Sequence, residues 1–144
     1  TISSASGLVS NAGGTLYSAS KFAIEGWIEG LAEELAPFGI RSLVVDPGMM
    51  RTDFLDPRSA RHGDIPVADY AETAAGFEAY IAGVNHQQVN DPAVLAAHIV
   101  ALAGSSGVPS RFVFGPDALE WVAHKLARLR GEMEQSAAIA ASAD

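Results

Sequence analysis

The sequence predicts an α/β fold with parallel strands, because one long amphipathic helix lies between two short segments of strand character. Apolar residues recur at helical spacing over 16–38, and Pro37 with Gly39 marks the end of that helix. The segment IRSLVVD at 40–46 is short, apolar and rich in β-branched residues, which is typical of a buried strand. Residues 1–4 are consistent with the end of an earlier strand. Strand, helix and strand in this order predict a parallel βαβ unit with a right-handed crossover.

The remainder of the chain adds helices and one further strand. We expect helices at about 68–84, 91–103 and 117–135, and a short strand at 111–115. Asp91 and Pro92 supply a cap and a first-turn proline for the second of these helices. The tail after this last helix is small and polar enough to fray. The sequence thus predicts about three strands and four helices in one partial domain over residues 1–144, whereas a complete doubly wound nucleotide-binding sheet has about six strands.

The composition limits the classes of partner. Nine Lys and Arg residues stand against seventeen Asp and Glu residues, a formal net charge of −8, which disfavours a nonspecific nucleic-acid binder. The absence of cysteine excludes disulfides and thiolate metal sites and is compatible with a cytoplasmic protein. No apolar run is long enough to span a bilayer. His86, His98 and His124 have no partner at metal-ligand spacing. We therefore expect a small-molecule substrate, with no nucleic acid, no membrane and no metal.

Tyr17 and Lys21 form the first pattern with chemical meaning. They are four residues apart near the start of the predicted helix and hence share one face. A nearby ammonium and the positive end of the helix dipole both favour the phenolate, which suits proton transfer at an alcohol or carbonyl. A lysine follows a given tyrosine at this spacing by chance about one time in twenty, so the pair alone is more often a solvated helix face. The serines before it have a similar alternative, as capping and turn residues.

Three motifs together resemble the short-chain dehydrogenase/reductase family. ISSASG at 2–7 precedes YSASK at 17–21, with Ser4 thirteen residues before Tyr17, as in the active-site segment of that family. After one helix and one strand, DPGMMRTD at 46–53 reproduces its Pro-Gly-x-x-x-Thr signature at Pro47, Gly48 and Thr52. The resemblance extends over the whole chain and implies the C-terminal part of a doubly wound, parallel-sheet Rossmann fold.

The resemblance implies a catalytic role for three residues. Tyr17 would be the acid/base, Ser4 would hydrogen-bond the substrate oxygen, and Lys21 would contact the nicotinamide ribose and favour the phenolate. The implied reaction interconverts an alcohol and a ketone or aldehyde by hydride transfer with NADP or NAD, NADP being slightly favoured. Besides Tyr17 and Lys21, the residues implied at the nicotinamide are Pro47, Gly48, Met50 and Thr52.

The family's glycine-rich pyrophosphate turn, Thr-Gly-x-x-x-Gly-x-Gly, has no counterpart in these 144 residues. We therefore expect a longer protein whose N-terminal nucleotide-binding half is absent here, and a fragment that is inactive by itself. The alternative is a non-catalytic relative that keeps the fold for binding or assembly. Intact Tyr17 and Lys21 favour the enzyme, since a binding protein has no need of both.

Two further segments have roles implied by the resemblance. Residues 53–90 occupy the position of the family's substrate loop or lid. The helix at 16–38 commonly contributes to a subunit interface, which implies a homodimer or homotetramer; the alternative is that Trp27 and its apolar neighbours simply cover the sheet. Within this helix, Glu25, Glu29 and Glu33 are expected on a different face from the apolar stripe.

Overall fold

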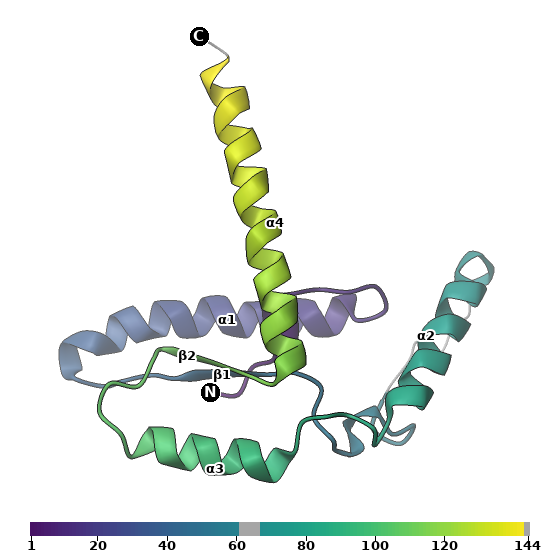
Figure 1. The fold of residues 1–144 in the computed structure, drawn as a ribbon, viewed down its shortest axis with the longest axis horizontal. Coiled ribbons are helices and arrows are strands. Elements are labelled where there is room, and N and C mark those ends of the chain that lie inside the picture. Colours follow the sequence, from purple (N-terminus) through teal and green to yellow (C-terminus); the bar gives the residue numbers. More distant parts are fainter. Residues whose placement is uncertain (61–66, 143–144) are drawn as a thin grey trace. The chain divides into compact units, whose positions relative to one another are not determined.

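The computed structural model describes residues 1–60 and 67–142, and over these the chain forms four α-helices and one two-stranded sheet (Figure 1). The helices and strands, in chain order, are α1 (Thr15–Leu35), β1 (Val44–Pro47), α2 (Ala71–Val84), α3 (Pro92–Ala103), β2 (Arg111–Phe114) and α4 (Pro116–Ala141). They group into two compact units, one of Thr1–Gly48 with Pro109–Asp144 and one of Met49–Val108. None of the described helices is both long and apolar enough to cross a membrane.

The sheet belongs to the first unit and is parallel, as predicted. β1 and β2 pair in register from Val44 with Arg111 to Pro47 with Phe114. All four residues of β1 are buried, which explains the run of β-branched residues in this segment. The strand begins later than the predicted bound and extends one residue further, into the proline.

The N-terminal segment contributes less to the sheet than we expected. Ile2 forms an isolated parallel bridge with Val45, and the Ser3 N–H donates to the Val45 carbonyl at 2.8 Å. The chain then leaves the sheet, because the next residues form a 3₁₀ turn at Ala5–Gly7. The prediction of about three strands is therefore wrong for the described chain, which has two strands and one bridge.

α1 confirms the long predicted helix, and a 3₁₀ turn at Ala36–Phe38 continues it to the expected end. Gly39 ends that turn with a φ of 69°, a left-handed conformation that favours glycine. Helix α1 runs alongside the sheet in Figure 1. The prediction of which residues of α1 face inward is only partly correct.

The buried residues of α1 are Ser18, Glu25 and Ile28, whereas Trp27 is 58% exposed. Placing Glu25 on a different face from the inward residues was wrong, because the three buried residues follow one another at spacings of seven and three and so share one face of the helix. Glu25 is tolerated there because an arginine from β2 reaches it, as described below.

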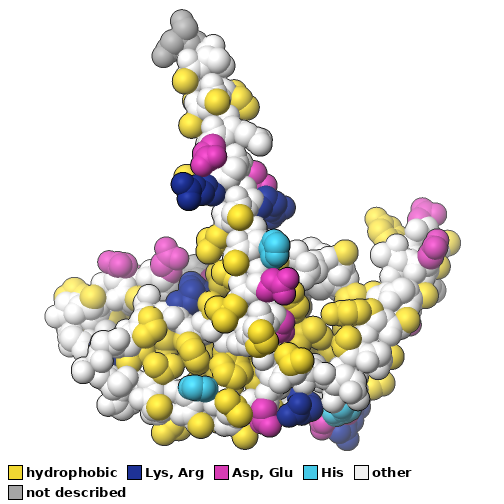
Figure 2. All heavy atoms as spheres, viewed as in Figure 1, with side chains coloured by type: hydrophobic (Ala, Val, Ile, Leu, Met, Phe, Trp, Pro, Cys, Tyr) yellow, Lys and Arg dark blue, Asp and Glu magenta, His cyan; other side chains and the backbone are white. Residues whose placement is uncertain are grey.

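Helix α4 continues well beyond the predicted end at residue 135. The expectation that the tail frays is wrong up to Ala141, because the segment is rich in alanine, which has the highest helix propensity. Figure 2 shows hydrophobic side chains exposed along this helix, among them Leu126, Met133 and Ile139.

The second unit contains α2, α3 and the turns that join them. Asp91 caps α3 by accepting from the Ala93 N–H at 2.8 Å, which confirms the predicted cap. Met50 forms an isolated parallel bridge with Asn90, and the Arg51 guanidinium pairs with Asp91 at 3.1 Å. Of the expected lid at 53–90, residues 61–66 lie outside the described chain.

Candidate active site

Ser4 lies at the point where the N-terminal segment leaves the sheet. Its backbone is extended, its side chain is buried, and its Oγ accepts from the Ser6 N–H at 3.1 Å, so that it caps the 3₁₀ turn. The capping alternative considered for this serine therefore holds. The cap uses the oxygen as an acceptor and leaves the O–H as a donor, so capping and hydrogen bonding to a substrate are compatible.

Tyr17 and Lys21 lie together in the first two turns of α1. The Lys21 Nζ is 5.8 Å from the centre of the Tyr17 ring, a distance at which an ammonium is attracted by the aromatic face. Tyr17 is 38% exposed, so its phenol is within reach of a bound molecule. The helix places a cation beside a phenol at its positive end, as the spacing predicted.

Pro47 is the last residue of β1 and Gly48 follows it, at the edge where parallel α/β sheets bind ligands. The Gly48 N–H donates to the Phe114 carbonyl at 2.9 Å. A side chain at Gly48 would collide with the Asp117 carboxylate at the start of α4. Any larger residue at position 48 would therefore force the Asp117 side chain to move.

Met50 and Thr52 belong to the second unit and are described within it. Met50 is the residue that bridges Asn90, and Thr52 caps a 3₁₀ turn at Asp53–Leu55 by accepting from the Phe54 N–H at 3.3 Å. The other predicted site residues belong to the first unit. They are Ser4 on the N-terminal segment, Tyr17 and Lys21 on α1, and Pro47 and Gly48 at the end of β1.

A buried charge cluster next to these residues was missed by the sequence analysis. Arg111 Nη1 donates to Glu25 Oε2 at 2.5 Å and to Asp46 Oδ2 at 2.6 Å. The carboxylates are almost fully buried, with Glu25 6% and Asp46 0% exposed. An aspartate inside an apolar strand was the one available signal, since a carboxylate is buried only when it is paired.

The two carboxyls differ in pKa. Burial, and next the hydrogen bond with Glu25, raise the pKa of Asp46 to about 6. Burial also opposes ionisation of Glu25, but the Ser3 hydroxyl, the Asp46 carboxyl and the Arg111 guanidinium outweigh it and lower the pKa of Glu25. The pair therefore retains one proton up to a pH of about 6, and that proton belongs to both groups.

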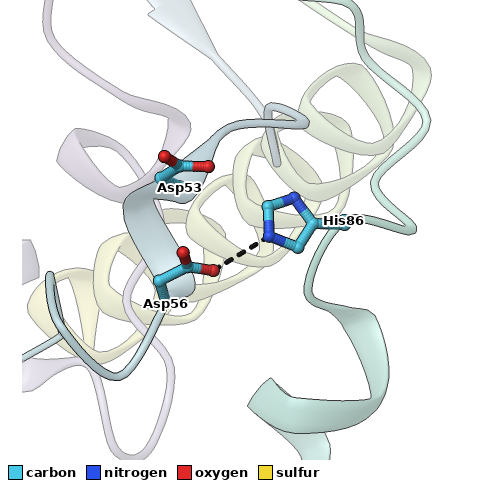
Figure 3. A group of neighbouring side chains, drawn as sticks. All are labelled: Asp53, Asp56 and His86. Atoms are coloured by element: carbon cyan, nitrogen blue, oxygen red, sulfur yellow. Dashed lines mark hydrogen bonds and ion pairs between the residues drawn. The ribbon is translucent and has the colours of Figure 1, made fainter.

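A second cluster lies in the other unit, where Asp53, Asp56 and His86 bring ligand-type atoms within 4.8 Å of one another (Figure 3). Metal-ligand spacing in the sequence gave no sign of it, because the histidine is thirty residues from its partner. Arg58 pairs with both carboxylates, at 2.7 Å to Asp53 and 3.1 Å to Asp56. The Asn85 amide, and then His86 and Arg58, lower the pKa of Asp56. The Arg58 guanidinium already pairs with both carboxylates, so we interpret the cluster as an ion-pair network.

The chain is similar in sequence and in structure to known oxidoreductases. The family model for short chain dehydrogenases matches residues 1–63, which contain every site residue named from the sequence. An oxidoreductase of Botryotinia fuckeliana is 30% identical over 122 residues, which are 83% of this chain and 43% of the relative. An uncharacterized oxidoreductase of Escherichia coli K12 is 36% identical over 92 residues, 62% of this chain and 34% of the relative.

A solved structure of a short-chain dehydrogenase from Streptomyces avermitilis superposes with a TM-score of 0.80 at 36% identity. It covers 99% of this chain, and the chain covers 51% of it. The chain therefore spans about half the length of that protein and less than half of the two curated relatives.

Proposed function

We propose, since this chain belongs to the short-chain dehydrogenase family, that the protein is an NAD(P)-dependent oxidoreductase that interconverts an alcohol and a ketone or aldehyde. The observation that carries the proposal is the Lys21 ammonium 5.8 Å from the ring of a partly exposed Tyr17, at the start of a helix in the matched segment. A cation beside a phenol has a clear use in moving a proton to or from a substrate oxygen.

In this proposal the three residues divide the work. Tyr17 donates its proton to the carbonyl oxygen during reduction and accepts it back during oxidation. Ser4 orients the same oxygen through its O–H, since its Oγ lone pair is engaged by the Ser6 N–H. Lys21 stabilises the phenolate that remains on Tyr17, because opposite charges at this separation attract.

The donor groups of the first unit fit the nicotinamide ribose of a dinucleotide. The Lys21 ammonium and Tyr17 hydroxyl can bond ribose hydroxyls. The family resemblance assigns the chain from the end of β1 onward to the carboxamide, through Pro47, Gly48, Met50 and Thr52. The bound nicotinamide supplies or accepts the hydride. The sequence has no glycine-rich turn for the pyrophosphate, so these 144 residues fit one end of the cofactor.

We further propose that the activity belongs to a longer protein of the Rossmann type, with this chain as its catalytic half and residues 53–90 as its substrate lid. The 144 residues alone should then bind dinucleotides weakly. Calorimetric titration of the isolated chain with NADPH and with NADH should give no saturation in the micromolar range. A micromolar Kd would overturn this part of the proposal.

The function itself is tested on the full-length protein with a panel of ketones and aldehydes, by following NADPH and NADH oxidation. Carbonyl-dependent oxidation is expected for at least one member of the panel. Binding of either dinucleotide without turnover on any member would favour the second candidate, a non-catalytic relative. Every observation that is compatible with a non-catalytic relative is equally compatible with the enzyme.

The exposed apolar side chains of α1 support a homodimer or homotetramer formed through this helix. Leu16 is 88% and Trp27 58% exposed, and an interface along α1 would cover both side chains. The oligomer is the part of the proposal most easily separated from catalysis, because Trp27 lies on a different face of α1 from the buried residues.

A further inference from the structure

Glu25, Asp46 and Arg111 link three elements of the first unit through one nitrogen atom. Arg111 Nη1, from β2, donates to Glu25 Oε2 of α1 and to Asp46 Oδ2 of β1. Exposed ion pairs on this chain, such as Arg130 with Glu134, have both side chains largely in water. Here both carboxylates are buried, so the contact cannot be exchanged for hydration without loss of packing.

The charges of this cluster do not balance when both acids are ionised. Two carboxylates then face one guanidinium, and Glu25 Oε1 and Asp46 Oδ1 are buried with no hydrogen-bond partner among the described residues. One proton retained by the pair removes the excess charge and supplies a donor where an oxygen has none. The polar groups that face the pair are the Ser3 hydroxyl from the N-terminal segment and Arg111 from β2, besides the two acids themselves.

Both carboxylates of the cluster lie close along the chain to residues of the candidate active site. Asp46 precedes Pro47 and Gly48 in the chain, and Glu25 is one helical turn after Lys21. Ser3, which precedes Ser4, packs with Glu25 against Gly7, where an added Cβ would lie 2.9 Å from both Ser3 Oγ and Glu25 Cγ. The three segments that bear the proposed catalytic and nicotinamide residues of this unit therefore meet at one place.

We propose that Glu25, Asp46 and Arg111 form a positioning centre, in which one proton held by the two carboxyls fixes α1 and the N-terminal segment against the end of β1. The inference rests on the proposed function, because the placement of α1 and the N-terminal segment matters only if Ser4, Tyr17 and Lys21 are catalytic. Glu25, Asp46 and Arg111 would act through those three residues. Loss of the proton places two like charges in contact, which separates α1 from β1 and moves Tyr17 relative to Ser4.

The centre is tested first without any assay of activity. Carboxyl and backbone amide signals of the isotope-labelled chain are followed by NMR from pH 5 to 8. We expect the Asp46 carboxyl to titrate with a midpoint near 6, and the amides of Ser4 and Tyr17 to shift with the same midpoint. No carboxyl titration in this range, or a titration to which both amides are silent, would overturn the inference.

Variants then separate positioning from general stability. Asp46→Asn should abolish the common midpoint at the Ser4 and Tyr17 amides. Glu134→Gln, an equivalent change in the exposed pair with Arg130, should leave it in place. If Asp46→Asn does not fold, Glu25→Gln is used in the same way, and the wild-type titration decides the matter in either case. Persistence of the midpoint in a folded Asp46→Asn chain contradicts the assignment.

In the full-length protein the same variants act on kcat. The pH profile of kcat should contain a step near 6 in the wild type, absent from Asp46→Asn and present in Glu134→Gln. The step should be on the order of tenfold or more, the effect of a small misplacement of reacting groups. A profile in which Asp46→Asn keeps the step contradicts the positioning role. A full-length wild-type protein with no turnover would contradict the proposed function but not the positioning centre. The amide titration would still decide whether that centre exists.

Discussion

Lys21 is the one lysine of α1, and its ammonium lies beside Tyr17, the proposed acid/base. Its replacement is therefore the most direct single-residue test of the site. Lys21→Met should lower kcat/KM of the full-length enzyme on the order of 100-fold, because the phenolate loses its stabilising charge and the ribose a donor. Lys125→Met, at the other lysine of the chain, is the matched control and should remain within about twofold of the wild type, the ordinary result of a surface change. Equal activities of the two variants would contradict the role given to Lys21.

Gly48 carries a packing requirement that a single methyl group tests. Gly48→Ala should destabilise the chain by about 1–3 kcal/mol, since its Cβ overlaps the Asp117 carboxylate. Gly131→Ala, in the open interior of α4, should instead stabilise it by up to about 1 kcal/mol. Urea denaturation of the three proteins measures both effects. Adding Asp117→Ala to Gly48→Ala should recover most of the loss, and no recovery would show that the overlap is not the cause.

Strand β1 contains the Asp46 carboxyl, whose raised pKa makes the free energy of unfolding depend on pH. The folded-state pKa of Asp46 is about 6, above its ordinary value of 3.8. Between these values the folded state keeps a proton that the unfolded state releases, so this group makes the chain less stable as pH rises from 4 to 6. The lowered pKa of Glu25 acts in the opposite direction and mostly below its ordinary value of 4.5.

Asp46→Asn removes the first of these effects. From pH 4.5 to 7 the free energy of unfolding of the variant, relative to the wild type, should rise by roughly 2 kcal/mol, because each unit of pKa shift is worth about 1.36 kcal/mol and part of the effect already lies below pH 4.5. Urea denaturation at several pH values measures the difference. Parallel curves for the two proteins would show that Asp46 titrates alike in the folded and unfolded states.

The elements show which parts of the fold the sequence could predict. The parallel strands, the long helix and the cap of α3 follow from local patterns of period, propensity and capping, and the structure confirms them. The place of Glu25 does not, because its partner Arg111 is 86 residues away and helical spacing alone does not show which face is covered. The prediction that the tail frays is wrong up to Ala141 because the helix propensity of its alanines outweighs their small size.

The candidate site was predictable to a different extent. The grouping of Tyr17 with Lys21 needs only the period of a helix, and it is found. The capping bond of Ser4 was open to either interpretation, since one hydroxyl can cap and donate at the same time. The Asp53, Asp56 and His86 cluster depends on a tertiary approach that spacing cannot reveal.

For the whole molecule, assembly is the property with the most direct test. The apolar side chains of α1 should hold subunits together, so Trp27→Glu should give a lower mass in sedimentation than the wild type at the same concentration. Ile139→Glu, which places the same charge at a 71% exposed apolar position of α4, is the control and should leave the mass unchanged. A wild type that is already monomeric, or a Trp27→Glu protein of unchanged mass, would exclude this interface.

The central claim, that a phenol of this chain exchanges a proton with the substrate oxygen, is tested most directly by Tyr17→Phe in the full-length protein. The change removes one oxygen atom from a partly exposed side chain, so the melting temperature should stay near that of the wild type. The account predicts that kcat for carbonyl reduction falls on the order of 10²–10⁴-fold, the usual contribution of a general acid. Turnover within a few-fold of the wild type, with the protein folded and its dinucleotide bound, would contradict it.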